Sequence, residues 1–151
     1  MPANIDPIAI KSINNDAGIW LPATTANTKS DGVGTIATDM VLCFTAGANG
    51  SLVQKIRFLP CASVAATATT ASVIRVFRTS VASGATTNAN THLVQELAAP
   101  SQTADQTTVA VVPLEIALNL QLKSGEYLLF SMHHAAAAST SWKANVFGGD
   151  Y

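Results

Sequence analysis

Large aliphatic side chains occupy every second position of residues 114–122, which read Leu-Glu-Ile-Ala-Leu-Asn-Leu-Gln-Leu. A β-strand directs successive side chains to opposite faces, whereas a helix would spread this stripe around its axis. The same two-residue period runs through residues 52–59 and 72–79. The alternation therefore predicts a strand in each of the three segments.

The strand expected at residues 52–59 separates an apolar face from a basic one. Leu52, Gln54, Ile56 and Phe58 are expected on one face, and Val53, Lys55, Arg57 and Leu59 on the other. Pro60 is expected to end this strand because proline cannot donate to a ladder. We interpret Lys55 and Arg57, with Arg75 on the next strand, as decoration of a solvated or subunit-facing sheet surface.

Shorter apolar runs predict strands at residues 35–45, 92–97, 107–112, 127–133 and 142–147. Gly, Pro and Asn separate these runs, and no stretch has a helical period. About seven or eight short strands with turn signals between them are typical of sandwiches and jelly rolls. The predicted fold class is all-β: a two-sheet antiparallel sandwich, jelly-roll-like, with an irregular N-terminal arm.

The arm is expected at residues 1–31 and the sandwich domain at residues 32–151. Three prolines and an Asn-Asn-Asp-Ala-Gly turn cluster interrupt the arm, which leaves room for one or two short strands, such as a weak edge strand formed by Ile8, Ile10 and Ile13. Trp20 and Leu21 are expected to pin the arm to the body. Aliphatic and aromatic residues near the two ends are the candidates for an interface: Ile8, Ile10, Trp20, Leu21, Trp142 and Tyr151.

Charged residues make up only 11% of the chain, against about 25% in typical soluble domains. Protein interfaces are depleted in Lys, Glu and Asp, so this composition favours a subunit of an assembly. The net charge of −1 offers no basic patch for nucleic acid. Neither a secretory leader nor an apolar run long enough for a membrane span is recognised, which predicts synthesis in a cytoplasm.

Candidate catalytic chemistry is sparse. His133 and His134 are adjacent on a predicted strand, so they are expected on opposite faces and not on one metal. No Gly-x-Ser-x-Gly elbow and no phosphate-binding loop occur. Cys43 and Cys61 are expected as free thiols in a reducing compartment. The sequence therefore predicts no enzymatic activity, no metal site and no cofactor.

Three segments carry a resemblance to a known group of proteins. They are residues 49–58, the segment 114–127 with its Leu-x-Leu-x-x-Gly-x-Tyr ending, and the closing segment from Trp142 to Gly-Gly-Asp-Tyr. They resemble small virion proteins of tailed bacteriophages, over residues 32–151. The resemblance implies a capsid decoration or cement protein that forms a dimer or trimer, binds the major capsid protein across capsomer joints, and resides in the virion.

Two alternatives to capsid decoration follow from the same residues. A tail or fibre component belongs to the same structural class. A carbohydrate-binding adhesion module would need exposed aromatic side chains, for which Trp20 and Trp142 are the candidates. None of these roles requires a catalytic residue, a cofactor, nucleic acid or a membrane.

Overall fold

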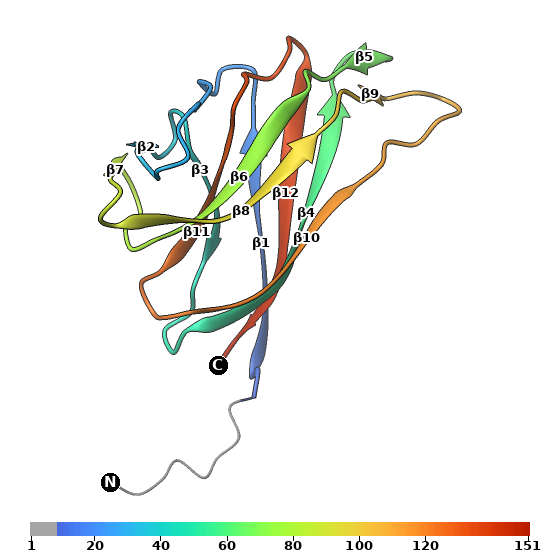
Figure 1. The fold of residues 1–151 in the computed structure, drawn as a ribbon. Coiled ribbons are helices and arrows are strands. Elements are labelled where there is room, and N and C mark those ends of the chain that lie inside the picture. The colour runs from blue at the N-terminus through green and yellow to red at the C-terminus, as the bar shows by residue number, and fades with distance from the viewer. Residues whose placement is uncertain (1–8) are drawn as a thin grey trace, which may run out of the picture.

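The computed structural model describes residues 9–151, whose regular structure consists of strands (Figure 1). The long strands are β1 (Ser12–Trp20), β3 (Val41–Thr45), β4 (Ser51–Ala62), β6 (Ser72–Thr79), β8 (Thr91–Ala99), β10 (Leu114–Leu122), β11 (Tyr127–Met132) and β12 (Thr140–Asp150). Two short pairs complete the fold, β2 (Gly34–Thr35) with β7 (Ala85–Thr86), and β5 (Thr67–Ala68) with β9 (Thr103–Ala104). Residues 9–151 include no helix with the length and hydropathy that a membrane span requires.

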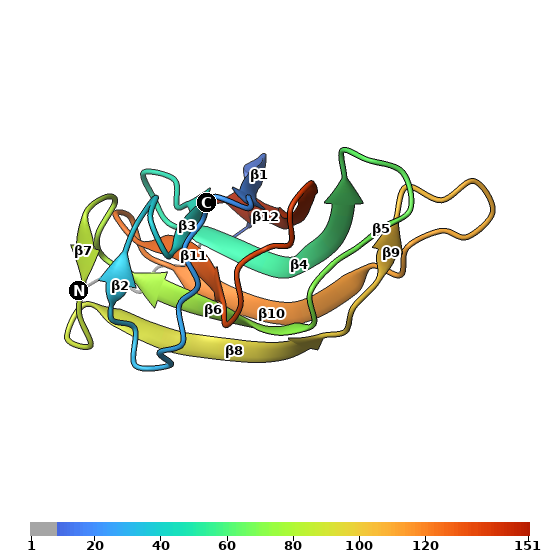
Figure 2. The same ribbon diagram turned by 90° about the horizontal axis from the view of Figure 1, so that it is seen from above.

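The long strands form two four-stranded sheets, β1-β12-β4-β10 and β3-β11-β6-β8, in which every pairing is antiparallel (Figures 1 and 2). The first long strand pairs with the last, the second with the second to last, and so on inward to β6 with β8. A long hairpin that is folded over itself in this way is a jelly roll. The predicted all-β sandwich is therefore confirmed.

The core lies between the two sheets and consists of large apolar side chains that point inward from both. Trp20 and Trp142 are cross-strand partners and are both buried. The ring of Phe130, from the facing sheet, lies 6.0 Å from that of Trp20 and 5.5 Å from that of Phe58. Aromatic rings at these distances bury large apolar areas, so they hold the two sheets together.

A smaller apolar cluster covers part of the outer face of the second sheet. Phe77 and Leu129 point outward from this sheet and are buried beneath Ile36 and Met40. Asn27 ties the same covering segment to the sheet, because its backbone N–H donates to the carbonyl of Met132 at 2.9 Å. Residues 21–40 thus cover one outer face of the sandwich, while no comparable segment within residues 9–151 lies over the outer face of the first sheet.

The buried Arg75 lies beneath this covering segment. Its Nε donates to Glu96 at 2.6 Å, and its Nη1 donates to the carbonyl of Asn27 at 3.2 Å. A guanidinium that is removed from water requires such partners. The sequence-based assignment of Arg75 to a solvated sheet surface is therefore wrong.

Several strand boundaries differ from the predictions. Residues 72–79 and 114–122 are strands as predicted. Pro60, however, lies inside β4 opposite Trp142. The register between β4 and β12 shifts at Gln54, so Val53 is buried and Gln54 is exposed. A bulge of one residue reverses the side-chain alternation beyond it, which local periodicity did not reveal.

Two further expectations are corrected. Residues 107–112 belong to no strand in the structure. His133 and His134 follow the end of β11 and lie in a bend, and their rings are in edge contact with centres 5.0 Å apart. They are not on opposite faces, because the alternation of a strand does not extend past its last residue.

Residues 12–20 lie in the segment that was expected to be an arm, and they form the edge strand β1 of the first sheet. This strand pairs with β12 over its whole length, from Ser12 opposite Asp150 to Trp20 opposite Trp142. The weak edge strand expected from Ile8, Ile10 and Ile13 lies further along the chain in the structure: β1 contains Ile13, Ile10 precedes it, and Ile8 lies outside the described residues. Whether residues 1–31 reach a partner stays a prediction.

A polar clamp joins the ends of three strands at Asp150. Its carboxylate accepts hydrogen bonds from the hydroxyl of Ser51 and, at 2.8 Å, from the amide of Asn14. The same Ser51 hydroxyl accepts the backbone N–H of Gly47 at 2.9 Å. The hydrogen bonds from Ser51 and Asn14, in that order, lower the pKa of the Asp150 carboxyl because they favour its ionised form.

Replacing Asp150 by Asn should reduce stability at neutral pH and flatten its dependence on pH. A lowered carboxyl pKa stabilises the fold above the unfolded value of about 3.9, and this contribution is lost as the pH falls through the folded value. Chemical unfolding from pH 7 to pH 2 measures both effects. Ser51→Ala should change the profile in the same direction, and a profile unchanged in both variants would contradict the clamp.

Candidate interaction surface

A stripe of exposed aliphatic side chains follows the edge of the first sheet. The fractional exposures are 82% for Ile13, 50% for Leu21, 46% for Ile19 and 41% for Ile10. Within β1, Ile13 and Ile19 are six positions apart, and an even spacing in a strand places side chains on the same face. We call Ile10, Ile13, Ile19 and Leu21 the β1 stripe.

The β1 stripe is exposed because of how β1 meets the second sheet. Gly18 of β1 lies so close to β3 that a Cβ atom at this position would be 2.8 Å from the carbonyl oxygen of Leu42. This close approach closes one side of the sandwich and buries the neighbouring Trp20. The opposite face of β1, which carries Ile13 and Ile19, is left toward solvent.

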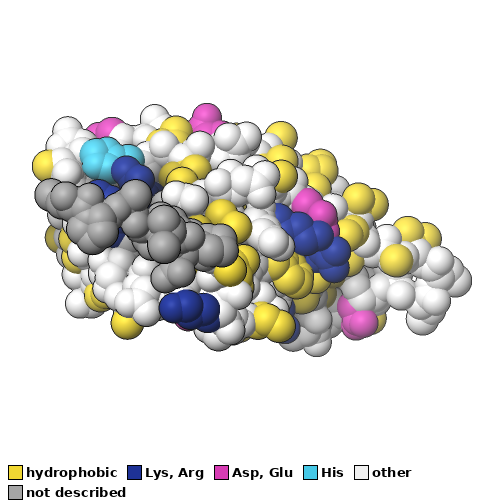
Figure 3. Space-filling model, turned by 90° about the horizontal axis from the view of Figure 1, so that it is seen from below, with side chains coloured by type: hydrophobic (Ala, Val, Ile, Leu, Met, Phe, Trp, Pro, Cys, Tyr) yellow, Lys and Arg dark blue, Asp and Glu magenta, His cyan; other side chains and the backbone are white. Residues whose placement is uncertain are grey.

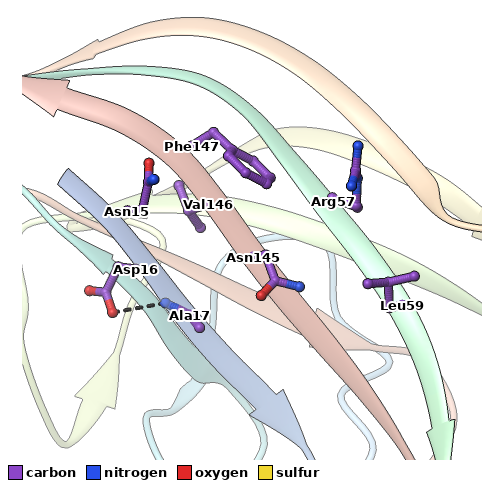
Figure 4. A pocket seen from close by; sticks show the side chains of 8 residues that line it. All are labelled: Asn15, Asp16, Ala17, Arg57, Leu59, Asn145, Val146 and Phe147. Carbon is purple, nitrogen blue, oxygen red and sulfur yellow. Dashed lines mark hydrogen bonds between the residues drawn. The ribbon is translucent and has the colours of Figure 1, made fainter. Parts of the chain in front are cut away.

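An open hollow of about 540 Å³ lies beside the stripe on the outer face of the first sheet. Figure 4 shows its lining residues, which come from three adjacent strands: Asn15, Asp16 and Ala17 of β1, Asn145, Val146 and Phe147 of β12, and Arg57 and Leu59 of β4. The register sets Ala17 opposite Asn145 and Asn145 opposite Arg57. The hollow therefore results from small and polar side chains in one row across the sheet.

The basic residues predicted on β4 form a compact ionic cluster next to this hollow. Glu115 of β10 accepts Arg57 Nε at 2.6 Å and Lys55 Nζ at 3.2 Å. Both cations also lie over the ring of Phe147, at 5.3 Å for Lys55 Nζ and 5.7 Å for the Arg57 guanidinium carbon. The hydrogen bonds from Arg57 and then Lys55 lower the pKa of the Glu115 carboxyl. The single carboxylate of Glu115 thus holds both cations in place and balances one of their two positive charges.

A second hollow continues from the other end of the β1 stripe. Its apolar lining includes Ile19 and Leu21 of the stripe, together with Ile36, Val41 and Leu42. The two hollows therefore flank β1 along its length. The stripe and the second hollow are lined mainly by apolar groups, whereas the first hollow also includes the charged Asp16 and Arg57. An apolar surface with a few polar groups beside it suits contact with another protein.

The structure separates the predicted interface residues into two groups. Trp20 and Trp142 are buried, with 0% and 1% exposure, so they are core residues and not surface contacts. Ile10 and Leu21 are exposed members of the β1 stripe. Tyr151 is half-buried and donates its backbone N–H to the carbonyl of Gly50 at 3.1 Å. Ile8 lies outside the described residues.

Sequence reasoning missed Ile13 and Ile19 as surface residues. The alternation of Ile13, Asn15, Ala17 and Ile19 in the printed sequence was an available signal for one face of a strand. The turn-like residues at positions 14–18 obscured it, because Asn, Asp and Gly usually end strands. In the structure Asn15, Asp16 and Ala17 line a hollow instead.

Residues with the potential for chemistry are dispersed. Within residues 9–151, no three His, Cys, Asp or Glu side chains converge on a point where a metal ion would bind. Asp31 and Asp39 accept hydrogen bonds from nearby backbone N–H groups of their own turns. Cys43 is a free, buried thiol, and its burial, followed by the charge of Asp16, raises its pKa. A protonated thiol of this kind is a poor nucleophile.

Comparison with known proteins assigns no family to this chain. No family model matches it, and no curated protein matches it. A solved structure titled "Cyanophage Pam1 capsid asymmetric unit" aligns over 100% of this chain and 100% of that chain, with a TM-score of 0.41 and 15% identity. A likeness of this size identifies neither a family nor a function.

Substitutions in the core and on the surface should differ in how much they change the free energy of unfolding. Trp142→Ala should lower the free energy of unfolding by about 3–5 kcal/mol because it leaves a large cavity between the sheets. Ile13→Ser should change it by no more than about 0.5 kcal/mol because the side chain is already in water. Urea unfolding followed by tryptophan or tyrosine fluorescence measures both, and equal losses in the two variants would contradict this placement.

Proposed function

We propose that this chain is a structural protein of a tailed-phage particle, which decorates the capsid by binding across the joints between capsomers. Its role would be mechanical and would involve no catalytic step, cofactor or nucleic acid. The observation that carries the proposal is the β1 stripe on a jelly roll whose sequence has very few charges.

The surface composition supports a protein that functions in an assembly. Figure 3 shows one end of the molecule, where hydrophobic and uncharged atoms cover most of the described surface and charged side chains are few. An isolated soluble protein usually keeps a charged surface of mixed sign. Four large aliphatic side chains along one edge strand are more readily explained if a partner covers them.

The proposed docking surface is the β1 stripe with the outer face of the first sheet. In the part of the chain that the structure describes, this face has no covering segment like residues 21–40, which lie on the other sheet. The capsid protein would contact Ile13 and Ile19 and fill the hollow beside Ala17. The aliphatic contacts at Ile13 and Ile19 would involve no buried ion, whereas Asp16 and Arg57 at the hollow would require polar partners on the capsid protein.

The partner under this proposal is the major capsid protein, and the chain itself would act as a homo-oligomer, either a dimer or a trimer. Linked copies bind a lattice far more tightly than one copy, because each further contact is intramolecular after the first. Many individually weak contacts would then resist expansion of the shell. The protein would be made in the host cytoplasm and reside in the virion.

Binding to shells assembled from the major capsid protein alone tests the proposal. The chain should sediment with the shells, and the double variant Ile13→Asp with Ile19→Asp should bind at least about tenfold more weakly, which corresponds to 1.4 kcal/mol. Burying a carboxylate in an apolar contact without a partner is costly. Affinity is measured by co-sedimentation over a range of chain concentrations.

The matched control is Val64→Asp, which adds the same charge at a residue that is 56% exposed but distant in sequence from β1. This variant should bind like the native chain. Absence of binding to shells, together with detection of the chain in the tail fraction of purified particles, would favour a tail or fibre component instead. Equal binding by the double variant and the control would contradict the assignment of the surface.

A further inference from the structure

Residues 107–112 have the sequence of a strand but lie outside every sheet. Their sequence, Thr-Thr-Val-Ala-Val-Val, is rich in the β-branched residues that favour strands. They connect β9 to β10 in a loop that projects beyond the β5–β9 pair in both views (Figures 1 and 2). Val109 is 60% exposed and Val112 is 65% exposed. A segment whose sequence favours a strand is therefore exposed to solvent.

One side of this segment is already paired, although not with another strand. The side-chain amide of Gln102 donates to the carbonyl of Val112 at 3.0 Å, and its oxygen accepts the N–H of Val112 at 2.7 Å. These are the two hydrogen bonds that a neighbouring strand residue would exchange with Val112. Gln102 thus occupies the inner side of the segment.

The outer side of the segment is left without a partner. In a strand, successive residues direct their backbone groups to opposite sides, so a strand through residues 109–112 would direct those of Val109 and Val111 away from the side that Gln102 occupies. No hydrogen bond within residues 9–151 involves the backbone N–H or C=O of Val109 or Val111. With residues 109–112 in a strand conformation, this outer side would be an unpaired edge, and such edges are templates for pairing between molecules.

The charge pattern indicates which molecule fits this edge. Residues 106–113 contain no charged side chain. A second copy of the segment in antiparallel orientation would therefore place no like charges opposite each other, and valines would face β-branched or small residues. Such a pairing has two-fold symmetry and closes on itself. Pro113, which lacks an N–H, would end this ladder before β10.

We propose that residues 109–112 form an intermolecular strand that pairs antiparallel with the same segment of a second copy of this chain. The pairing uses the backbone groups of Val109 and Val111 and leaves the Gln102 contact to Val112 intact. It supplies the contact for the homo-oligomer within the proposed function, but it uses a different surface from the β1 stripe and does not require a capsid.

Sedimentation velocity of the native chain over a range of concentrations provides the first test, with a dimer expected. Val109→Lys should convert the dimer to a monomer, because two ammonium groups would lie close together beside the two-fold axis. Ile13→Lys is the matched control, since it places the same charge at a more exposed aliphatic residue, and it should remain a dimer. Circular dichroism should show that both variants keep the native fold.

A mixture of Val109→Lys and Val109→Glu provides a more specific test. Each variant alone should be a monomer, and the mixture should form a heterodimer because opposite charges replace like charges across the axis. Hydrogen exchange of the native chain should show concentration-dependent protection of the amides of Val109 and Val111. These amides should exchange freely in Val109→Lys.

Several results would overturn this proposal. They are a native chain that stays monomeric at every concentration, a Val109→Lys variant that remains a dimer, or a dimer in which the amides of Val109 and Val111 exchange freely. Each is distinct from failure of the proposed function. A monomer that binds capsid shells would refute only the intermolecular strand. A dimer that does not bind the shells would refute only the capsid role.

Discussion

The burial of apolar side chains between the two sheets is the interaction on which the rest of this structure depends. The inward faces of both sheets are strongly apolar, and the sandwich forms because these faces leave water together. Trp20, Phe130 and Trp142 lie at the centre of this contact and belong to the first, seventh and last long strands. The core therefore requires the ends of the chain to come together before it is complete.

The way in which the chain closes this core determines which outer surfaces can contact another molecule. The second sheet has residues 21–40 packed on its outer face, where Ile36 and Met40 bury Phe77 and Leu129. Among the described residues no equivalent segment covers the first sheet, so aliphatic side chains of the edge strand β1 and the polar and charged side chains of the outer face are exposed to solvent. The proposed docking surface follows from this asymmetry between the two faces of one sandwich.

Local alternation in the sequence was sufficient to predict the class of fold and several of its strands. Residues 72–79 and 114–122 were recognised because their aliphatic positions keep a strict period of two. The bulge at Gln54 was not recognised, because it depends on the register of β4 against β12, which lies about ninety positions away along the chain. Periodicity within one segment contains no information about its partner.

The candidate surface was less predictable than the fold. Both tryptophans were reasonable interface candidates by residue type, yet the pairing of Trp20 with Trp142 places them in the core. Residues 107–112 were predicted to form a strand and do not, because no partner strand within residues 9–151 lies beside them, although their sequence favours a strand. Propensity describes what a segment favours, whereas pairing depends on what the rest of the fold places beside it.

Cryo-electron microscopy of a phage particle that carries this chain is the most direct test of the central claim. The account predicts jelly-roll density over the joints between capsomers, with β1 and the outer face of the first sheet against the shell. Density at the tail alone, or copies attached to the capsid through the face that residues 21–40 cover, would contradict it.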